Sequence, residues 1–183
     1  MVLAVIMSAA RHQRYWQRPA AGSVEKLLLA WEHAIHQGNE AYTENQTQLA
    51  LQQYQLALKQ AKLLLREYVQ AKAGGEFSQG RCSVDQVLAA YVVSHHNLAD
   101  AHIRHGDVHT AACCLCEVHR CLSCIYSDPT LHDDLREAAQ RHGRRTYRAL
   151  LTLSRLYPQT SPLVEKTLHV CGQFCALQTQ ILH

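Results

Sequence analysis

The amino-acid sequence predicts an all-α protein built from stacked antiparallel helix hairpins. Apolar residues recur at spacings of three and four over most of the chain, which is typical of amphipathic helices. Polar breaks and helix-start signals divide this pattern into separate segments. Only eight Gly and four Pro interrupt the 183 residues, so long helices fit the chain better than the many turns of a β protein. We expect six or seven helices joined by short connections.

The first two expected helices lie before a loop at residues 73–82. Ser23 is a candidate N-cap for the first helix, whose apolar stripe includes Trp31 and Tyr42. A polar break at residues 44–46 separates this helix from the second one. The apolar stripe of the second helix comprises Ala50, Leu51, Tyr54, Ala57, Leu58, Ala61 and Leu65.

The third and fourth helices are predicted from a capping signal and a turn. Ser83 and Gln86 match a capping box, in which each side chain bonds to the backbone N–H of the other residue. A long helix is therefore expected from Ser83 to about His105. Gly106-Asp107 is expected to form the turn, and the fourth helix should continue to about Tyr126.

The C-terminal part of the chain is expected to supply the remaining helices. Asp128-Pro129 matches an N-cap followed by proline at the first helical position. The helical region that it opens either breaks near Gly143 or continues to Tyr157. Ser161-Pro162 repeats the start signal for a last helix that ends near Ile181.

Two of the predicted hairpins, at residues 31–64 and 92–125, share a pattern of small and large residues. Small residues fall where paired helices approach closely, and large residues fill the volume between them. The pattern consists of Gly38, Asn39, Ala50, Tyr54, Ala57 and Leu58 in the first hairpin, and of Leu98, Ala99, Gly106, Asp107, Ala111, Leu115 and Val118 in the second. It resembles the tetratricopeptide repeat (TPR) family, in a variant with longer helices.

This resemblance implies a domain organisation and a function. Residues 23–183 would form a single TPR-like domain, with residues 129–182 as its capping helices. Residues 1–22 fit no helical pattern and are expected to form a poorly ordered arm. The family lines a concave groove with the first helix of each hairpin, and this groove accepts a peptide or a helix. The resemblance therefore implies a non-catalytic protein–protein interaction module or scaffold. A secretion-type chaperone, which would hold a client protein in the same groove, is an alternative.

The groove-facing positions give the candidate partner-binding residues. They are Asn39, Tyr42, Asn97, Asp100 and Arg104. The expected partner is another protein or a peptide, bound by a monomer or a homodimer. Local hydrogen bonds, or bonds to water, are the alternative role for the two asparagines.

A further alternative is metal binding by one face of the fourth helix. His109, Cys113 and Cys116 are spaced four and three residues apart, so their side chains can converge on the face opposite the apolar stripe. Together they would offer three ligands to zinc or copper. Cys171 and Cys175, four residues apart, form another candidate pair. Because cysteine also packs as a small hydrophobe, the main interpretation includes no cofactor.

Several classes of function lack the sequence features that they need. The chain has no Gly-rich phosphate loop, no His-Glu-x-x-His and no nucleophile elbow, so an enzyme is not expected. A formal net charge of +3 indicates no nucleic-acid partner, and the basic stretch at residues 141–148 fits a solvated helix face. No stretch approaches the ~20 apolar residues of a membrane-spanning helix. Since no secretory signal is recognisable, the eight cysteines are expected to be mostly free thiols in a reducing cytoplasm.

Overall fold

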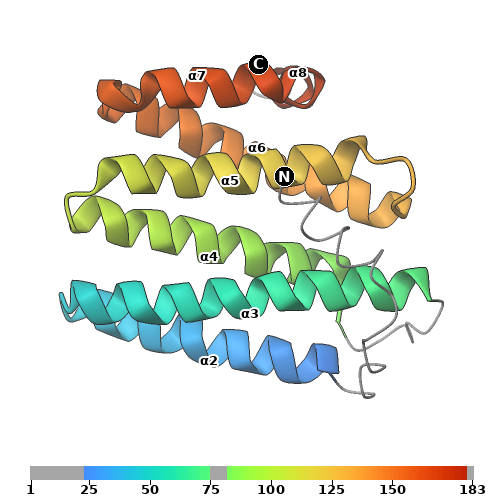
Figure 1. Ribbon diagram of the computed structural model, residues 1–183, viewed down its shortest axis with the longest axis horizontal. Coiled ribbons are helices and arrows are strands. Elements are labelled where there is room, and N and C mark those ends of the chain that lie inside the picture. Colours follow the sequence, from blue (N-terminus) through green and yellow to red (C-terminus); the bar gives the residue numbers. More distant parts are fainter. Residues whose placement is uncertain (1–22, 75–81, 181–183) are drawn as a thin grey trace, which may run out of the picture.

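The computed structural model describes residues 23–74 and 82–180, and all regular structure in these ranges is helical (Figure 1). The helices are α2 (Ser23–Thr43), α3 (Thr47–Ala73), α4 (Val84–Arg104), α5 (Val108–Ser127), α6 (Asp133–Leu156), the 3-10 helix η1 (Pro158–Thr160), α7 (Ser161–Val170) and α8 (Gly172–Thr179). The predicted all-α class is confirmed, and the seven α-helices of these ranges match the expected number. The arm predicted at residues 1–22 lies outside the described residues.

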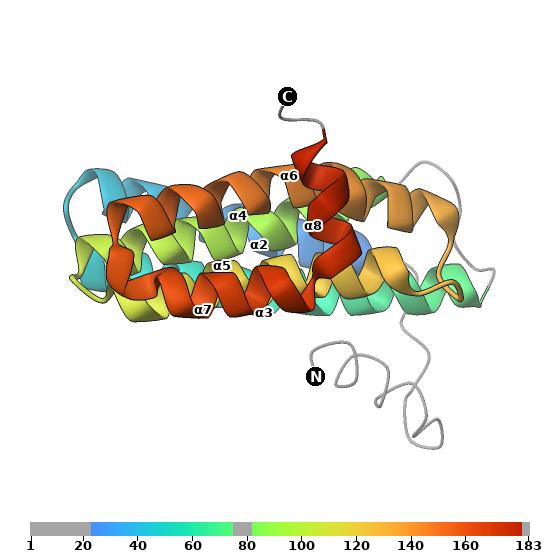
Figure 2. The ribbon, with the colours of Figure 1, turned by 90° about the horizontal axis from the view of Figure 1, so that it is seen from above.

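The helices stack as antiparallel hairpins in two layers. Helix α2 pairs with α3 and α4 with α5, and α6 leads through η1 into α7. Seen from above in Figure 2, α2, α4 and α6 form one layer, whereas α3, α5 and α7 form the other. Helix α8 leaves the end of α7 and crosses to α6. The order of the helices in space therefore follows their order in the sequence.

Residues at the corners explain where the hairpins turn. Asn45 closes the α2–α3 corner in the left-handed region, with a φ of 61°, and Gly106 closes the α4–α5 corner with a φ of 86°. The Asp107 carboxylate then accepts a hydrogen bond from the Thr110 N–H at 3.0 Å and so caps α5. The predicted turn at Gly106-Asp107 is confirmed.

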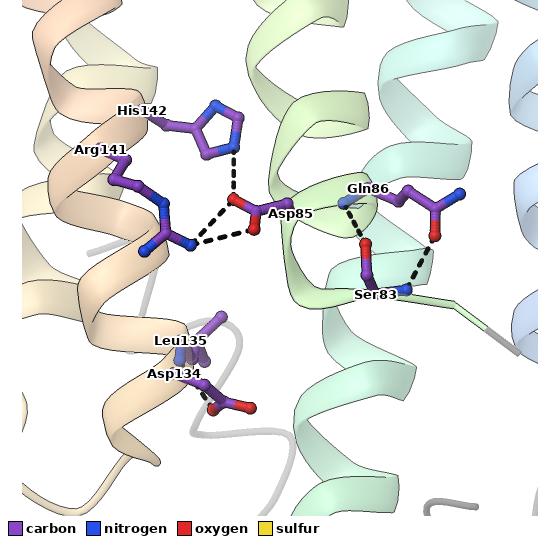
Figure 3. A network of polar contacts seen from close by, with 7 residues as sticks. All are labelled: Ser83, Asp85, Gln86, Asp134, Leu135, Arg141 and His142. Atoms are coloured by element: carbon purple, nitrogen blue, oxygen red, sulfur yellow. Dashed lines mark hydrogen bonds and ion pairs between the residues drawn. The ribbon is translucent and has the colours of Figure 1, made fainter. Parts of the chain in front are cut away.

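The predicted capping box is present at the start of α4 (Figure 3). The Ser83 hydroxyl accepts a hydrogen bond from the Gln86 N–H at 3.2 Å. In return, the Gln86 side chain accepts one from the Ser83 N–H at 2.8 Å. Two backbone donors that the helix itself leaves unpaired are thereby satisfied.

The predicted helix start at Asp128-Pro129 is wrong. The Asp128 carboxylate accepts hydrogen bonds from the Thr130 N–H and hydroxyl, at 2.9 and 2.6 Å, and so closes a turn after α5. Helix α6 begins only at Asp133. The reason is that an aspartate side chain can bond to the backbone two residues ahead as readily as it can cap a helix.

Of the two alternatives for the fifth helical region, the structure has the continuous one. Helix α6 runs without a break to Leu156. Gly143 lies inside this helix, where α8 packs closely against it. A Cβ at this position would lie 2.2 Å from Cζ of Phe174. The glycine therefore makes room for an aromatic ring and does not interrupt the helix.

The predicted last helix is in fact two helices. It starts at Ser161 as expected, but the chain breaks between α7 and α8 at Gly172, whose φ is 24°. Cys171, the C-cap residue after α7, lies directly before the break. The predicted end near Ile181 lies outside the described residues.

The small and large residues of the repeat pattern lie in the core. Ala50, Tyr54, Ala57, Leu98, Ala99, Ala111 and Leu115 are each at most 5% exposed. A Cβ at Gly38 would lie 2.5 Å from two atoms of the Tyr54 ring, so the glycine allows α2 and α3 to approach closely. Trp31, partly buried, donates from Nε1 to the Ser94 hydroxyl of α4 at 2.8 Å. Within the described ranges, none of the helices combines the length and apolarity needed to cross a membrane.

Candidate functional site

The five predicted groove residues lie on two neighbouring helices of one layer. Asn39 and Tyr42 are on the last turns of α2, and Asn97, Asp100 and Arg104 follow one another along α4. We call these five residues the polar cluster. Its α2 and α4 members lie about 60 residues apart in sequence, and four of the five touch a partner on the other helix, as the contacts below show.

Asn39 connects three helices. Its Oδ1 accepts a hydrogen bond from the Tyr54 hydroxyl of α3 at 2.9 Å and another from Asn97 Nδ2 of α4 at 3.2 Å. Burial, together with the charges of Tyr42 and Asp100, raises the pKa of Tyr54 to about 12. The phenol therefore keeps its proton near neutral pH and remains a donor to Asn39.

Arg104 is held against Tyr42. Its Cζ lies 3.4 Å from the centroid of the Tyr42 ring, and its Nη1 donates to the Tyr42 main-chain carbonyl. A guanidinium over an aromatic face gains cation–π attraction, and the hydrogen bond fixes its direction. The pair thus presents a positive charge on an immobilised side chain at the α2–α4 boundary.

Asp100 extends the polar cluster toward α6. It is exposed, yet partial desolvation raises the pKa of its carboxyl, and the charge of Arg145 on α6 opposes that rise. The same Arg145 charge adds to the effect of desolvation on His96, whose pKa falls to about 4. Arg145 therefore faces α4, and all three helices of the layer contribute to one polar surface.

An ion pair in which one guanidinium nitrogen contacts both carboxylate oxygens connects α4 and α6 (Figure 3). Nη2 of Arg141 lies 3.0 and 2.9 Å from the two carboxylate oxygens of Asp85, and Nε2 of His142 lies 3.5 Å from one of them. Both Asp85 and Arg141 are half exposed, so the pair orients the helices more than it stabilises them.

The basic stretch of α6 was missed as part of the site. Sequence reasoning interpreted residues 141–148 as a solvated face, and Arg141, Arg145 and Arg148 are indeed exposed. Their spacing of four and three residues also places them on one side of α6, and Arg145 shows that this side faces α4. The spacing of these arginines could be read from the sequence. It indicates a shared polar surface only once α4 is known to lie beside this side of α6.

The predicted metal ligands do not converge. His109 Nε2 lies 3.8 Å from Cys113 Sγ, and both residues are exposed on α5. Cys116, in contrast, is buried, and its Sγ lies 4.0 Å from the Leu163 carbonyl of α7. The expected placement of Cys116 with the other two is wrong, because the third hairpin covers that side of α5. In the ranges that the structure describes, no group of three or more His, Cys, Asp or Glu is arranged to hold a metal ion.

A second polar group lies inside the molecule, between α5, α6 and α8. It contains His119, Thr146, Cys171 and Cys175, all of which are at most 8% exposed. His119 Nδ1 lies 2.7 Å from the Thr146 hydroxyl, and its Nε2 lies 3.3 Å from Cys175 Sγ. Sequence reasoning paired the two cysteines but missed His119, because nothing in the local sequence brings α5 to α8.

A family model described as "Protein of unknown function (DUF2753)" matches residues 29–181. This range includes every described helix except the beginning of α2. No curated protein and no solved structure is significantly similar to the chain.

Proposed function

The chain belongs to the DUF2753 family, and we propose that it is a non-catalytic protein-interaction module. The binding surface is the outer side of the α2–α4–α6 layer, and the ligand is an extended segment or a helix of another protein. The observation that carries this proposal is the hydrogen bond between Asn39 and Asn97, which joins two hairpins in an exposed position.

This bond leaves one donor and one acceptor for a ligand. Asn39 uses Oδ1, and Asn97 uses Nδ2. Neither Nδ2 of Asn39 nor Oδ1 of Asn97 has a partner among the described residues. An extended peptide presents carbonyl and N–H groups along its backbone, so it can accept from the first atom and donate to the second.

The charges beside the polar cluster favour a ligand with acidic groups. Arg104 is fixed over Tyr42, and Arg145, Arg148 and Arg155 lie along one side of α6. In the part of the chain that the structure describes, no carboxylate lies within ion-pair distance of these α6 arginines. Guanidinium groups bind carboxylates with directed hydrogen bonds, so acidic side chains or a C-terminal carboxylate suit this surface.

The resemblance to the TPR family supports the same surface. In that family the first helix of each hairpin contacts the ligand, and α2 and α4 are these helices here. The close packing of Gly38 against Tyr54 agrees with the resemblance. A reducing, cytoplasmic setting fits as well, since all eight cysteines are free.

A comparative co-purification tests the proposal. The tagged full chain, the double variant Asn39→Ala/Asn97→Ala and a control variant are each isolated from the native host under reducing conditions. The control is Gln52→Ala/Lys59→Ala, which removes two exposed side chains of α3 in the other layer. We expect a polypeptide that accompanies the wild type and the control, and that the double variant loses at least about tenfold, a change of ~1.4 kcal/mol.

Equal recovery of this polypeptide with all three proteins would contradict the proposal. Loss of the polypeptide supports it only when the double variant is still folded, which cooperative thermal unfolding of the purified variant verifies. Co-expression then separates the scaffold from the chaperone alternative. A chaperone keeps its client soluble only when both are expressed together, whereas a scaffold leaves the solubility of its partner unchanged.

A further inference from the structure

Four arginines form a straight row along the exposed side of α6. Arg141, Arg145, Arg148 and Arg155 follow one another at intervals of four, three and seven residues, and all four side chains are exposed. At 100° per residue, these intervals keep the row within about 80° of the helix surface. We call these four residues the arginine stripe. Its guanidinium groups are therefore presented together on one side of the molecule.

The arginine stripe runs beside α4. Its first member, Arg141, contacts Asp85 of α4 at 2.9 and 3.0 Å (Figure 3). Helices α4 and α6 lie side by side in one layer. Because α5 returns between them, both helices run in the same direction. The later members of the stripe therefore pass along the later turns of α4, where Asn97 and Arg104 of the polar cluster lie.

Most of the arginine stripe has no acidic partner in the ranges that the structure describes. Its first member pairs with Asp85. No described carboxylate lies within ion-pair distance of the other three, although Asp100 of α4 is near enough to Arg145 for the two charges to interact. Guanidinium groups in a row repel one another, so an anionic ligand stabilises this surface.

Apolar residues of α4 lie next to the arginine stripe. Ala89 and Val93 are half-buried, and they follow Asp85 at intervals of four residues. Residues four apart turn by about 40° around a helix. Ala89 and Val93 therefore lie on α4 between Asp85, which faces α6, and Asn97 of the polar cluster. A ligand beside the stripe meets a narrow apolar surface as well as positive charges.

We propose that the ligand of this surface is an amphipathic acidic helix of another protein. It lies along α6, with its carboxylates on the arginine stripe and its apolar side chains on Ala89 and Val93. This inference rests on the proposed function and names the chemistry of the partner. Guanidinium groups bind carboxylates with directed hydrogen bonds, and a helix can present an acidic row and an apolar row side by side.

The spacing of the arginine stripe favours a helix over an extended segment. Along the α6 axis, the second, third and fourth arginines lie about 6, 10.5 and 21 Å from the first. Glutamates at the same intervals on a partner helix reproduce these distances. In an extended segment, side chains on one side recur every ~6.7 Å, so the third carboxylate would lie about 3 Å from the third arginine along the axis.

Titration of the full chain with designed peptides tests the proposal. The first probe is a fluorescent, end-blocked helical peptide with leucines on one side and, beside them, glutamates at intervals of four, three and seven residues. The second probe is an isomer of the same composition, whose glutamates are distributed around the helix. At low ionic strength, we expect fluorescence anisotropy to show at least about fivefold tighter binding of the first peptide. Added salt should weaken this binding.

Variants of matched charge locate the binding site. Arg145→Gln/Arg148→Gln removes two charges from the stripe, whereas Lys59→Gln/Lys166→Gln removes two exposed charges from α3 and α7 in the other layer. We expect the stripe variant to bind the first peptide about fivefold to tenfold more weakly, and the control to stay within about twofold of the wild type. Thermal unfolding of each variant verifies that it is folded.

Several results would overturn the proposal. Equal binding of the two peptides, or equal weakening by the two variants, would mean that the protein responds only to net charge. Absence of binding to either peptide would also contradict it. Tighter binding of a single-stranded oligouridylate RNA than of the first peptide would identify the stripe as a nucleic-acid site. If the Asn39→Ala/Asn97→Ala variant still loses its co-purifying polypeptide, the interaction module is retained and only the acidic helix is wrong.

Discussion

Asn39 joins two hairpins at a point where its side chain remains exposed. Its oxygen accepts from Tyr54 within its own hairpin and from Asn97 of the next one. A neutral hydrogen bond of this kind contributes about 0.5–1.5 kcal/mol to stability when it is buried, and less when water can replace it. The polar cluster is therefore a place where binding can be disrupted without unfolding the protein.

We accordingly expect Asn97→Ala to lower the free energy of unfolding by less than about 1 kcal/mol. Urea unfolding followed by circular dichroism measures the change. Ala99→Leu is the contrasting variant, because Ala99 is 1% exposed between packed helices and the added volume should cost ~1–3 kcal/mol. A larger loss for Asn97→Ala than for Ala99→Leu would show that the asparagine is structural.

Two buried histidines make stability depend on pH. His95 and His119 have no exposed surface, and burial lowers the pKa of each from 6.5 to about 4. As the pH falls below 6.5, His95 and His119 bind protons in the unfolded chain but stay neutral in the folded chain. Unfolding is therefore favoured at low pH. The stability is therefore complete above about pH 6.5 and is lost toward pH 4, by an amount on the order of a few kcal/mol.

Urea midpoints between pH 7.5 and about 4.5 test this pH dependence. The variant His119→Gln removes one of the titrating groups and should make the decline shallower. A decline as steep as that of the wild type would mean that His119 is not protected from protonation in the folded protein.

Gly143 gives a prediction about packing. A Cβ there would lie 2.2 Å from Phe174 Cζ and 2.9 Å from Gln178 Nε2. Overpacking costs ~1–3 kcal/mol, whereas the better helix propensity of alanine returns at most ~1 kcal/mol. We expect Gly143→Ala to destabilise the chain by about 1 kcal/mol or more in thermal unfolding. The double variant Gly143→Ala/Phe174→Leu should lose less than the sum of the two single variants.

At the scale of single helices, the start of α4 is better defined than that of α3. Ser83 and Gln86 form a capping box, whereas Gln46 before α3 makes no side-chain capping bond. We expect Ser83→Ala to cost about 1 kcal/mol. The matched substitution Gln46→Ala should stay within about 0.5 kcal/mol of the wild type. Equal effects of the two substitutions on the urea midpoint would show that the capping box adds no stability.

Short sequence motifs predict helix starts and turns correctly when each motif is compatible with only one local structure. The Ser83–Gln86 capping box and the Gly106-Asp107 turn are of this kind. Asp128 has two outcomes, a helix cap and a turn, and the sequence favoured the wrong one. The break at Gly172 was missed because a single glycine in a helical pattern is often tolerated.

At the scale of the whole molecule, the contacts between hairpins could not be predicted from the sequence. The resemblance to the TPR family placed Asn39 and Asn97 at groove-facing positions of separate helices, but their hydrogen bond depends on the register of α2 against α4. For the same reason Cys116, grouped by spacing with His109, is covered by α7. Residue types at the candidate site were predictable, whereas their partners required the packed structure.

Hydrogen exchange tests the central claim most directly. The full chain is compared with and without the polypeptide that it captures, and amide protection is measured for each helix. Binding to the α2–α4–α6 layer predicts slower exchange at the end of α2, along α4 and in the middle of α6, and unchanged exchange in α3 and α5. Protection confined to α3, α5 and α7, or to the exposed His109–Cys113 side of α5, would contradict the proposed binding surface.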